Sequence, residues 1–226
     1  MREFGIESGR SGGPVHFQVS DAVALGPGLA LQGVRLRFQR NEEIFGEGEP
    51  AEHVYRVVSG AVRTVRFSAD GRRQIMAFHL PGDVFGIAPN KQHGCSAEAV
   101  SEAEISLVRR SLIETAAGQD INATHALLGL ISRELQCSQE HAQLLGRKGA
   151  GERVAAFLLQ LGERFASGRE IDLPMSRADI ADYLALTIET VSRAFTQMER
   201  DQFIALPSSR HVVVRDRMAL EHLQAA

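Results

Sequence analysis

The sequence predicts an α+β protein in which a β-rich domain, a long helix and a small helical domain follow one another. Three observations predict this class. Short alternating apolar runs separated by Gly-rich turns fill the first half of the chain. A long stretch without proline follows, and two short amphipathic helices with a hairpin signal come near the C-terminus. With 226 residues and 44% hydrophobic side chains, the chain is long enough to form two cores.

The N-terminal half predicts a tail and then a β-roll. Residues 1–25 are rich in Gly and Ser, and we expect them to form a flexible tail. From Val34 to Arg110, runs such as HVYRVVSG and RQIMAFHL are separated by the turn signals Asp70-Gly71 and Pro81-Gly82-Asp83. Strands and turns that repeat at intervals of roughly 8–12 residues are typical of a β-roll or barrel. We therefore expect a β-roll domain over residues 26–118.

Residues 119–146 predict a long dimerisation helix. Between Asp120 and Leu145 there is no proline, and apolar or small side chains recur at spacings of three and four residues, close to a coiled-coil seam. The side chains that we expect at the dimer interface are Leu127, Ile131, Leu135, Ser138, Ala142 and Leu145. Leu128 and Leu144 lie off this seam, and we expect them to pack on their own subunit. The alternative is a helix buried within one subunit. Gly146 and Gly149-Ala150-Gly151 then predict a hinge.

The segment from Ser176 to Ile204 predicts two helices joined by a tight turn. Ser176 with Asp179 three residues later has the spacing of a helix start, and Thr187 can cap the second helix. At ~100° per residue, one face of the second helix carries Val191, Ala194, Phe195 and Met198, and the opposite face carries Glu189, Ser192, Arg193 and Thr196. The polar face offers groups that hydrogen-bond base edges in a DNA major groove. The alternative is an ordinary amphipathic helix pair.

The residues after Ile204 favour the DNA-binding interpretation. Pro207-Ser208-Ser209 is a turn signal, and the run from Arg210 to Arg215 is short, β-branched and basic at both ends. Although a plain surface hairpin is the alternative, a hairpin here completes a winged helix-turn-helix over residues 147–226, a module that commonly binds DNA as a symmetric dimer. We expect contacts to the DNA backbone from Ser176, Arg177, Thr187, Thr190, Thr196, Arg210 and His211.

Composition and motifs exclude several other classes. The net charge is −3, and residues 147–226 hold as many Asp and Glu as Lys and Arg, so DNA affinity must depend on where the basic groups lie. Two Cys argue against a secreted disulfide scaffold and predict a reducing cytoplasm. A signal peptide and an apolar membrane span are both absent, so no membrane partner is expected. Nucleophile-elbow, zinc-protease and P-loop motifs are also absent, so an enzyme is not expected.

Several motifs in order resemble the Crp–Fnr family of bacterial transcription regulators, from about residue 30 to the end. They are FxxxExIFxEGExAEHVYxVxSGxVR from Phe38, DGRRQI and PGDVFG between Asp70 and Gly86, ERVAAFLLxL from Glu152 and MSRADIADYLALTIETVSRAF from Met175. The T-x-E-T-x-S-R core resembles the Fnr and FixK branch. The resemblance implies a cyclic-nucleotide-binding-like jelly roll, a dimerisation helix and a winged helix. It also implies a homodimer, double-stranded DNA and RNA polymerase as partners, and low-oxygen, nitrogen-fixation or denitrification genes as targets.

The resemblance also implies a DNA site and base contacts. Fnr-type members recognise a palindrome of the type TTGAT-N4-ATCAA. Arg193 would donate to a guanine, Glu189 would accept from a cytosine or adenine amino group, and Ser192 would touch the thymine side of the half-site. Ile188 would contact a thymine methyl group. For an activator, the hairpin loop from Ala69 to Arg73 would contact RNA polymerase.

The sensor half lacks the ligand-binding residues of the characterised branches. Cys95 and Cys137 are too few for a four-thiolate iron–sulfur cluster in one subunit. Ile87 stands where cyclic-AMP regulators have Glu, and Cys95-Ser96 stands where they have Arg-Ser. We therefore expect no cofactor and no metal, as in FixK-type regulators. Cys95 remains a candidate redox switch, and the alternative function is a ligand-gated regulator that senses a small molecule, haem or redox state in the β-roll.

Overall fold

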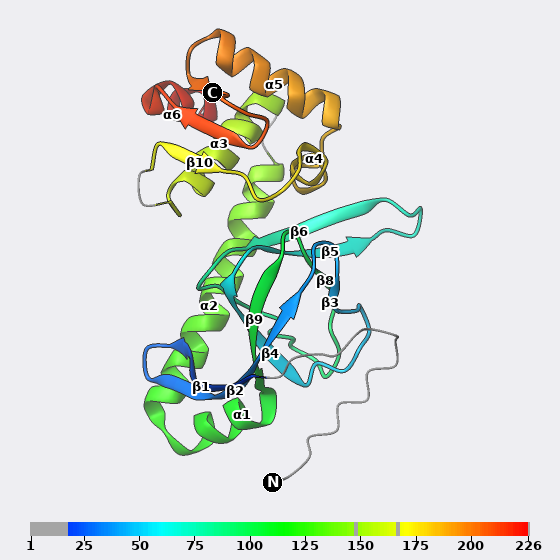
Figure 1. Cartoon of the computed structure of the whole chain (residues 1–226), viewed down its shortest axis with the longest axis vertical. Coiled ribbons are helices and arrows are strands. Elements are labelled where there is room, and N and C mark those ends of the chain that lie inside the picture. Colours follow the sequence, from blue (N-terminus) through cyan, green and yellow to red (C-terminus); the bar gives the residue numbers. More distant parts are fainter. Residues whose placement is uncertain (1–17, 147–148, 166–167, 226) are drawn as a thin grey trace.

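The computed structural model describes residues 18–146, 149–165 and 168–225. A β-roll forms the N-terminal domain, a long helix runs along its side, and a helical domain lies at the far end of that helix (Figure 1). This arrangement confirms the predicted α+β class, with a β-roll followed by a winged helix-turn-helix.

Two antiparallel sheets form the β-roll. The first has the strand order β1-β2-β9-β4-β7 and the second has the order β3-β8-β5-β6. The strands are β1 (Gln18–Gly26), β2 (Leu29–Phe38), β3 (Glu43–Phe45), β4 (His53–Ser59), β5 (Val62–Phe67), β6 (Arg73–His79), β7 (Val84–Phe85), β8 (Ser96–Ala99) and β9 (Ala103–Arg109).

A core between the two sheets holds the β-roll together. Alternate residues point inward from strands of both sheets and include Phe45, Tyr55, Phe85 and Ile105. Gly60 makes the turn between β4 and β5 with a φ of 79°, and a Cβ at this position would lie 2.2 Å from the carbonyl oxygen of Glu102. Only glycine fits such a close approach of two backbones.

The predicted tail over residues 1–25 is wrong at its C-terminal end. Strand β1 begins at Gln18 and pairs with β2 in an antiparallel register that runs from Gln18 opposite Arg35 to Gly26 opposite Leu29. Val23 and Leu25 are buried in β1 and contribute to an apolar cluster with the helices. Residues 1–17 lie outside the described residues.

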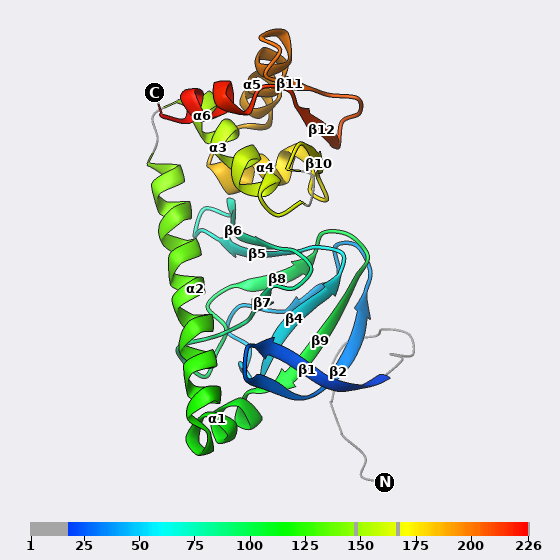
Figure 2. The same cartoon turned by 90° about the vertical axis from the view of Figure 1, so that its left-hand side faces the viewer.

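Two helices follow the β-roll, α1 (Arg110–Gln119) and α2 (Ile121–Leu145). Helix α2 confirms the predicted long helix, and the Asp120 carboxylate caps it by accepting from the backbone N–H of Asn122 at 2.9 Å. One side of α2 lies along the β-roll, where Ala123 joins the cluster that contains Val23 and Leu25 (Figure 2). Helix α2 therefore connects the two domains of the chain.

The C-terminal domain comprises α3 (Ala150–Gly162), β10 (Glu170–Asp172), α4 (Arg177–Leu184), α5 (Ile188–Arg200), β11 (Ile204–Ala205), β12 (His211–Val214) and α6 (Arg217–Ala225). Helix α3 begins at Ala150, so Gly151 lies inside a helix and not in the predicted hinge. Residues 147 and 148 of that hinge lie outside the described residues. Strands β10, β12 and β11 form a small antiparallel sheet that confirms the predicted hairpin.

In the described part of the chain, no helix has both the length and the apolar character needed to cross a membrane.

Candidate nucleic-acid interface

Helices α4 and α5 form the helix-turn-helix, and side-chain caps define both of their starts. The Ser176 hydroxyl accepts from the backbone N–H of Asp179 at 3.1 Å, while the Asp179 carboxylate accepts from the backbone N–H of Ser176 at 3.0 Å. This reciprocal pair is the capping box that the sequence predicts. Ala185 ends α4 in the left-handed region with a φ of 51°. The Thr187 hydroxyl caps α5 by accepting from Thr190 N–H at 3.2 Å, which confirms the predicted cap.

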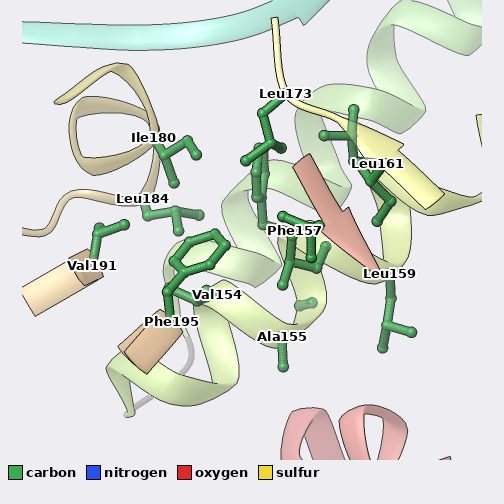
Figure 3. Close-up of a cluster of buried hydrophobic side chains, with 14 of the residues drawn as sticks. Val154, Ala155, Phe157, Leu159, Leu161, Leu173, Ile180, Leu184, Val191 and Phe195 are labelled. Carbon is green, nitrogen blue, oxygen red and sulfur yellow. The ribbon is translucent and has the colours of Figure 1, made fainter. Parts of the chain in front are cut away.

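The apolar face of α5 fixes the orientation of that helix. Val191, Phe195 and Met198 are buried against α3 and α4, as predicted from the helical period (Figure 3). Ile180 and Leu184 of α4 enter the same core. Truncation of a buried aromatic side chain such as Phe195 costs about 3–5 kcal/mol, so this packing holds α5 firmly in place.

The opposite face of α5 lies open to solvent at the end of the molecule away from the β-roll (Figures 1 and 2). The side chains of Glu189, Ser192, Arg193 and Thr196 are all exposed there. Hydrogen bonds from its own backbone N–H and from the Thr187 hydroxyl hold the pKa of Glu189 below its usual value. Glu189 is therefore an ionised acceptor at neutral pH, next to the Arg193 donor on one surface.

Ile188, a predicted base contact at the start of α5, is 43% exposed.

Two of the residues predicted to contact the DNA backbone form hydrogen bonds within α5. Thr190 accepts from Arg193 Nη2 at 3.5 Å, and the Thr196 hydroxyl donates to the Ser192 carbonyl at 3.0 Å. These local bonds leave the helix surface itself accessible.

Arg177, which the sequence predicts as a contact to the DNA backbone, packs against the recognition helix. Its guanidinium carbon lies 3.2 Å from the centre of the Phe195 ring. Burial lowers the pKa of Arg177 to about 10, and its Nη1 is buried with no hydrogen-bond partner among the described residues. Packing on the aromatic ring holds this side chain in a position that sequence spacing alone does not reveal.

The wing brings a second basic element to the same domain. Arg210 is exposed in the loop between β11 and β12, and its Nη1 donates to the Pro174 carbonyl at 3.3 Å. His211 Nδ1 lies 2.7 Å from Asp172 Oδ1, so a carboxylate of the neighbouring strand orients the ring. The sequence predicts both residues at the tip of the hairpin, and the structure places Arg210 in the loop and His211 at the first position of β12.

The free face of α2 agrees with the predicted seam at four of its six positions. Ile131, Leu135, Ser138 and Ala142 are exposed as expected, and Leu145 is half-buried. Leu127 packs partly against the β-roll, and Leu144 is buried in the core of the C-terminal domain. The expectation that Leu128 packs on its own subunit is wrong, because this side chain is 56% exposed. The free apolar positions are therefore Ile121, Leu128, Ile131, Leu135 and Ala142, which follow a heptad spacing.

A cavity of about 1140 Å³ lies between α2, the β-roll and the C-terminal domain. Ile87 and Cys95 line it, as the comparison with cyclic-AMP regulators suggests. His93 also lines it, is only 4% exposed and stacks on Phe45 with ring centres 3.7 Å apart. The Nε2 atom of His93 is buried and has no hydrogen-bond partner among the described residues.

Cys95 lacks the features of an activated thiol. Burial, followed by the nearby carboxylates of Glu47 and Glu134, raises the pKa of Cys95. Since the thiolate is the reactive form, this environment does not favour a redox switch. Within the described ranges, no group of three or more His, Cys, Asp or Glu side chains is arranged to hold a metal ion.

The side chains that hold α4 from outside its own domain could not be predicted from the sequence. Arg63 of β5, Arg73 and Gln74 of β6 and His141 of α2 all reach this helix. The only signal was the motif DGRRQI, which contains Arg73 and Gln74 but carries no indication of a partner more than a hundred residues away.

A β-roll, a long helix with a free apolar face and an exposed recognition helix together define a two-domain transcription regulator. Comparison with known proteins supports this class: residues 35–120 match the cyclic nucleotide-binding domain and residues 152–223 match the Crp-like helix-turn-helix domain. The chain belongs to the Crp–Fnr family of transcription regulators.

The similar proteins include several FixK regulators. The nitrogen fixation regulation protein FixK of Azorhizobium caulinodans is 50% identical over 202 residues, which cover 87% of this chain and 82% of that protein. FixK of Rhizobium meliloti is 41% identical over 202 residues, which cover 88% of this chain and 92% of that protein. The structure of FixK2 from Bradyrhizobium japonicum superposes with a TM-score of 0.84 at 47% identity, and the match covers 87% of this chain and 99% of that one.

Proposed function

We propose that this chain is a homodimeric transcription activator that binds a palindrome of the type TTGAT-N4-ATCAA and controls low-oxygen, nitrogen-fixation or denitrification genes. The observation that carries the proposal is the exposed polar face of α5, opposite a face on which Val191, Phe195 and Met198 are buried. The names of the FixK relatives support the physiological assignment to nitrogen fixation.

The groups on α5 match the edges of the bases in that half-site. Arg193 presents a guanidinium that donates two hydrogen bonds to O6 and N7 of a guanine. Glu189 is ionised and accepts from an amino group of cytosine or adenine. Ile188 lies beside them at the N-terminal end of the helix, where an apolar contact to a thymine methyl is favourable.

The free face of α2 supports a second copy of this chain as the partner. Leu128, Ile131 and Leu135 expose apolar side chains at spacings of three and four residues. A second α2 helix covers such a stripe with the same residues, which gives a symmetric interface. Two recognition helices about one helical turn of DNA apart then account for a palindromic site.

The tip of the hairpin between β5 and β6 is the surface we assign to RNA polymerase. Arg72 pairs with Asp70 at 2.7 Å within the tip, and Phe67 is exposed beside it. Arg73 is excluded from this surface because it is directed toward α4.

Selection of bound duplexes from a random DNA library tests the proposal, with and without reductant. We expect TTGAT-type palindromes to be enriched under both conditions. A matched and a scrambled duplex should then be titrated at two salt concentrations. Equal affinities for the two duplexes would contradict sequence-specific binding.

We propose ligand gating through the cavity beside α2 as a second candidate function. The supporting observation is the buried Nε2 of His93, because an unpartnered polar atom beside a cavity is favourable only when water or a ligand satisfies it. The test is DNA binding by the purified protein without additive. Full DNA affinity of the protein without additive argues against gating. DNA affinity that appears only after the low-molecular-mass fraction of a cell extract is added supports gating.

A further inference from the structure

The first helix of the helix-turn-helix is held at its N-terminal end by arginines of the β-roll. Arg63 Nη1 donates to Asp179 Oδ1 at 3.0 Å, and Arg73 Nη2 donates to the same oxygen at 2.8 Å. Arg73 Nε also donates to Asp182 Oδ2 at 2.7 Å, one turn further along α4. Asp179, which both arginines contact, is only 4% exposed and lies between the domains, whereas Asp182 is half-buried.

The β-roll holds Arg63 in place from its own side. Glu98 of β8 accepts from Arg63 Nη2 at 2.6 Å and from Arg63 Nε at 2.8 Å, and Asn41 accepts from Nη2 at 3.2 Å. The guanidinium is therefore fixed before it meets Asp179. Because its orientation is fixed, the Arg63 guanidinium determines where the Asp179 carboxylate must lie to form the ion pair.

The C-terminal end of α4 is held by the other elements of the sensor half. The Tyr183 carbonyl, which has no partner within its own helix, accepts from His141 Nε2 at 2.9 Å and lies 3.5 Å from Gln74 Nε2. The His141 and Tyr183 rings are parallel to within 1°, with centres 4.1 Å apart. The dimer-forming helix α2 thus contacts α4 directly.

These contacts bear on α5 because α4 and α5 move as one body. They share the core around Leu184, Val191 and Phe195 and are joined by a turn of three residues, Ala185 to Thr187. Any change in the orientation of α4 relative to α2 therefore moves the recognition helix relative to the dimer axis. Figure 2 shows α4 between the β5–β6 hairpin and α5.

We propose that Arg63, Arg73, Gln74 and His141 form an interdomain clamp on α4 that sets the spacing between the two DNA half-sites the dimer accepts. The proposal rests on the proposed function, because it requires a dimer that reads a palindrome. The four side chains act as positioning residues and touch no base.

The geometry of DNA makes spacing a sensitive measure of such a clamp. One added base pair separates the half-sites by about 3.4 Å and rotates one relative to the other by roughly 34°. A dimer with rigidly oriented recognition helices cannot follow this rotation without breaking its contacts. A dimer with loosened C-terminal domains can follow it, and its preference for one spacer becomes smaller.

The test compares palindromes with spacers of three, four and five base pairs, together with a duplex that carries one half-site. The clamp variant is Arg73→Met combined with Gln74→Leu, which leaves the buried pair between Arg63 and Asp179 intact. A second variant, Asp182→Asn, weakens the same contact from the side of α4. Arg72→Met is the matched control, because Arg72 is the adjacent arginine and pairs only within its own hairpin among the described residues. RNA polymerase, the partner proposed for that hairpin tip, is absent from this DNA-binding assay.

We expect the parent protein and the Arg72→Met control to prefer the four-base-pair spacer by about tenfold or more. The clamp variant should prefer it by about threefold or less, with Asp182→Asn in between, while all four proteins bind the single half-site within about twofold of one another. Thermal melting monitored by circular dichroism verifies that each variant is folded. A folded clamp variant with the spacer preference of the parent would overturn the clamp and leave the proposed function standing. A parent protein that binds no palindrome would overturn both.

Discussion

Replacement of Arg193 by Ala is the most direct test of the recognition helix. The Arg193 side chain is exposed on α5, and its only described hydrogen bond is the long 3.5 Å contact to the Thr190 hydroxyl. Its removal should therefore change the free energy of unfolding by no more than about 0.5 kcal/mol. The loss should appear in DNA affinity instead.

The magnitude follows from the number of contacts. A bidentate arginine–guanine pair discriminates against the wrong base by about 1–3 kcal/mol. A symmetric dimer makes this contact twice, so the affinity for the palindrome should fall by roughly 2–6 kcal/mol, which is about 30-fold at the least. The affinity for unrelated DNA should change much less, because each subunit loses one positive charge but keeps its other backbone contacts.

Fluorescence anisotropy with four duplexes, each with a different base pair at the predicted guanine position, measures the effect. The parent protein should prefer one of the four, and Arg193→Ala should bind all four with similar affinity. Arg200→Ala is the matched control, since Arg200 is an exposed arginine in the last turn of the same helix, away from the N-terminal end that enters the groove. A variant that retains the base preference of the parent would show that the polar face is wrongly assigned.

Three further predictions concern the dimer, the β-roll and pH. Leu135→Asp should convert the dimer into a folded monomer in sedimentation velocity, whereas Gln143→Asp, off the apolar stripe, should leave it dimeric. Gly60→Ala should lower the free energy of unfolding, measured with urea, by roughly 3 kcal/mol or more, because its Cβ would lie 2.2 Å from a backbone oxygen. Gly71→Ala, also at positive φ but in open space, should lower it by about 1–2 kcal/mol. Burial lowers the pKa of His79 to about 4, so the folded state binds fewer protons than the unfolded state below pH ~6.5. The free energy of unfolding, measured with urea, should therefore fall by about 2 kcal/mol between pH 7 and pH 5. His79→Gln should remove this part of the pH dependence.

The recognition helix could be predicted from sequence because its information is local. The period of the α-helix separates Val191 and Phe195 from Glu189 and Arg193, and the caps at Ser176 and Thr187 mark the starts of both helices. Each of these signals acts within four residues. The structure therefore confirms the placement of both faces, and the base contacts themselves stay a prediction.

The features that sequence reasoning missed depend on contacts between distant segments. The Gly- and Ser-rich composition that predicts a tail lies before residue 18, and residues 18–25 form β1 because they pair with β2. The free stripe on α2 includes Leu128 rather than Leu127, because the position of the β-roll decides which side of that helix is covered. The pair between Arg63 and Asp179 spans 116 positions in the chain, and no periodic pattern signals it.

The charge of the C-terminal domain is a reason to expect that the orientation of α4 affects DNA binding. Residues 147–226 are formally neutral, so the nonspecific attraction to phosphates that supports many DNA-binding proteins is small. In the proposed dimer, each recognition helix alone should then bind weakly, and high affinity should require that both half-sites are engaged at once. The gain from the second site depends on the effective concentration of the second helix, which is high only when its position is restricted to the correct one. In the proposed dimer, the β-roll and α2 restrict α4 at both ends, so less conformational entropy should be lost when the second recognition helix binds.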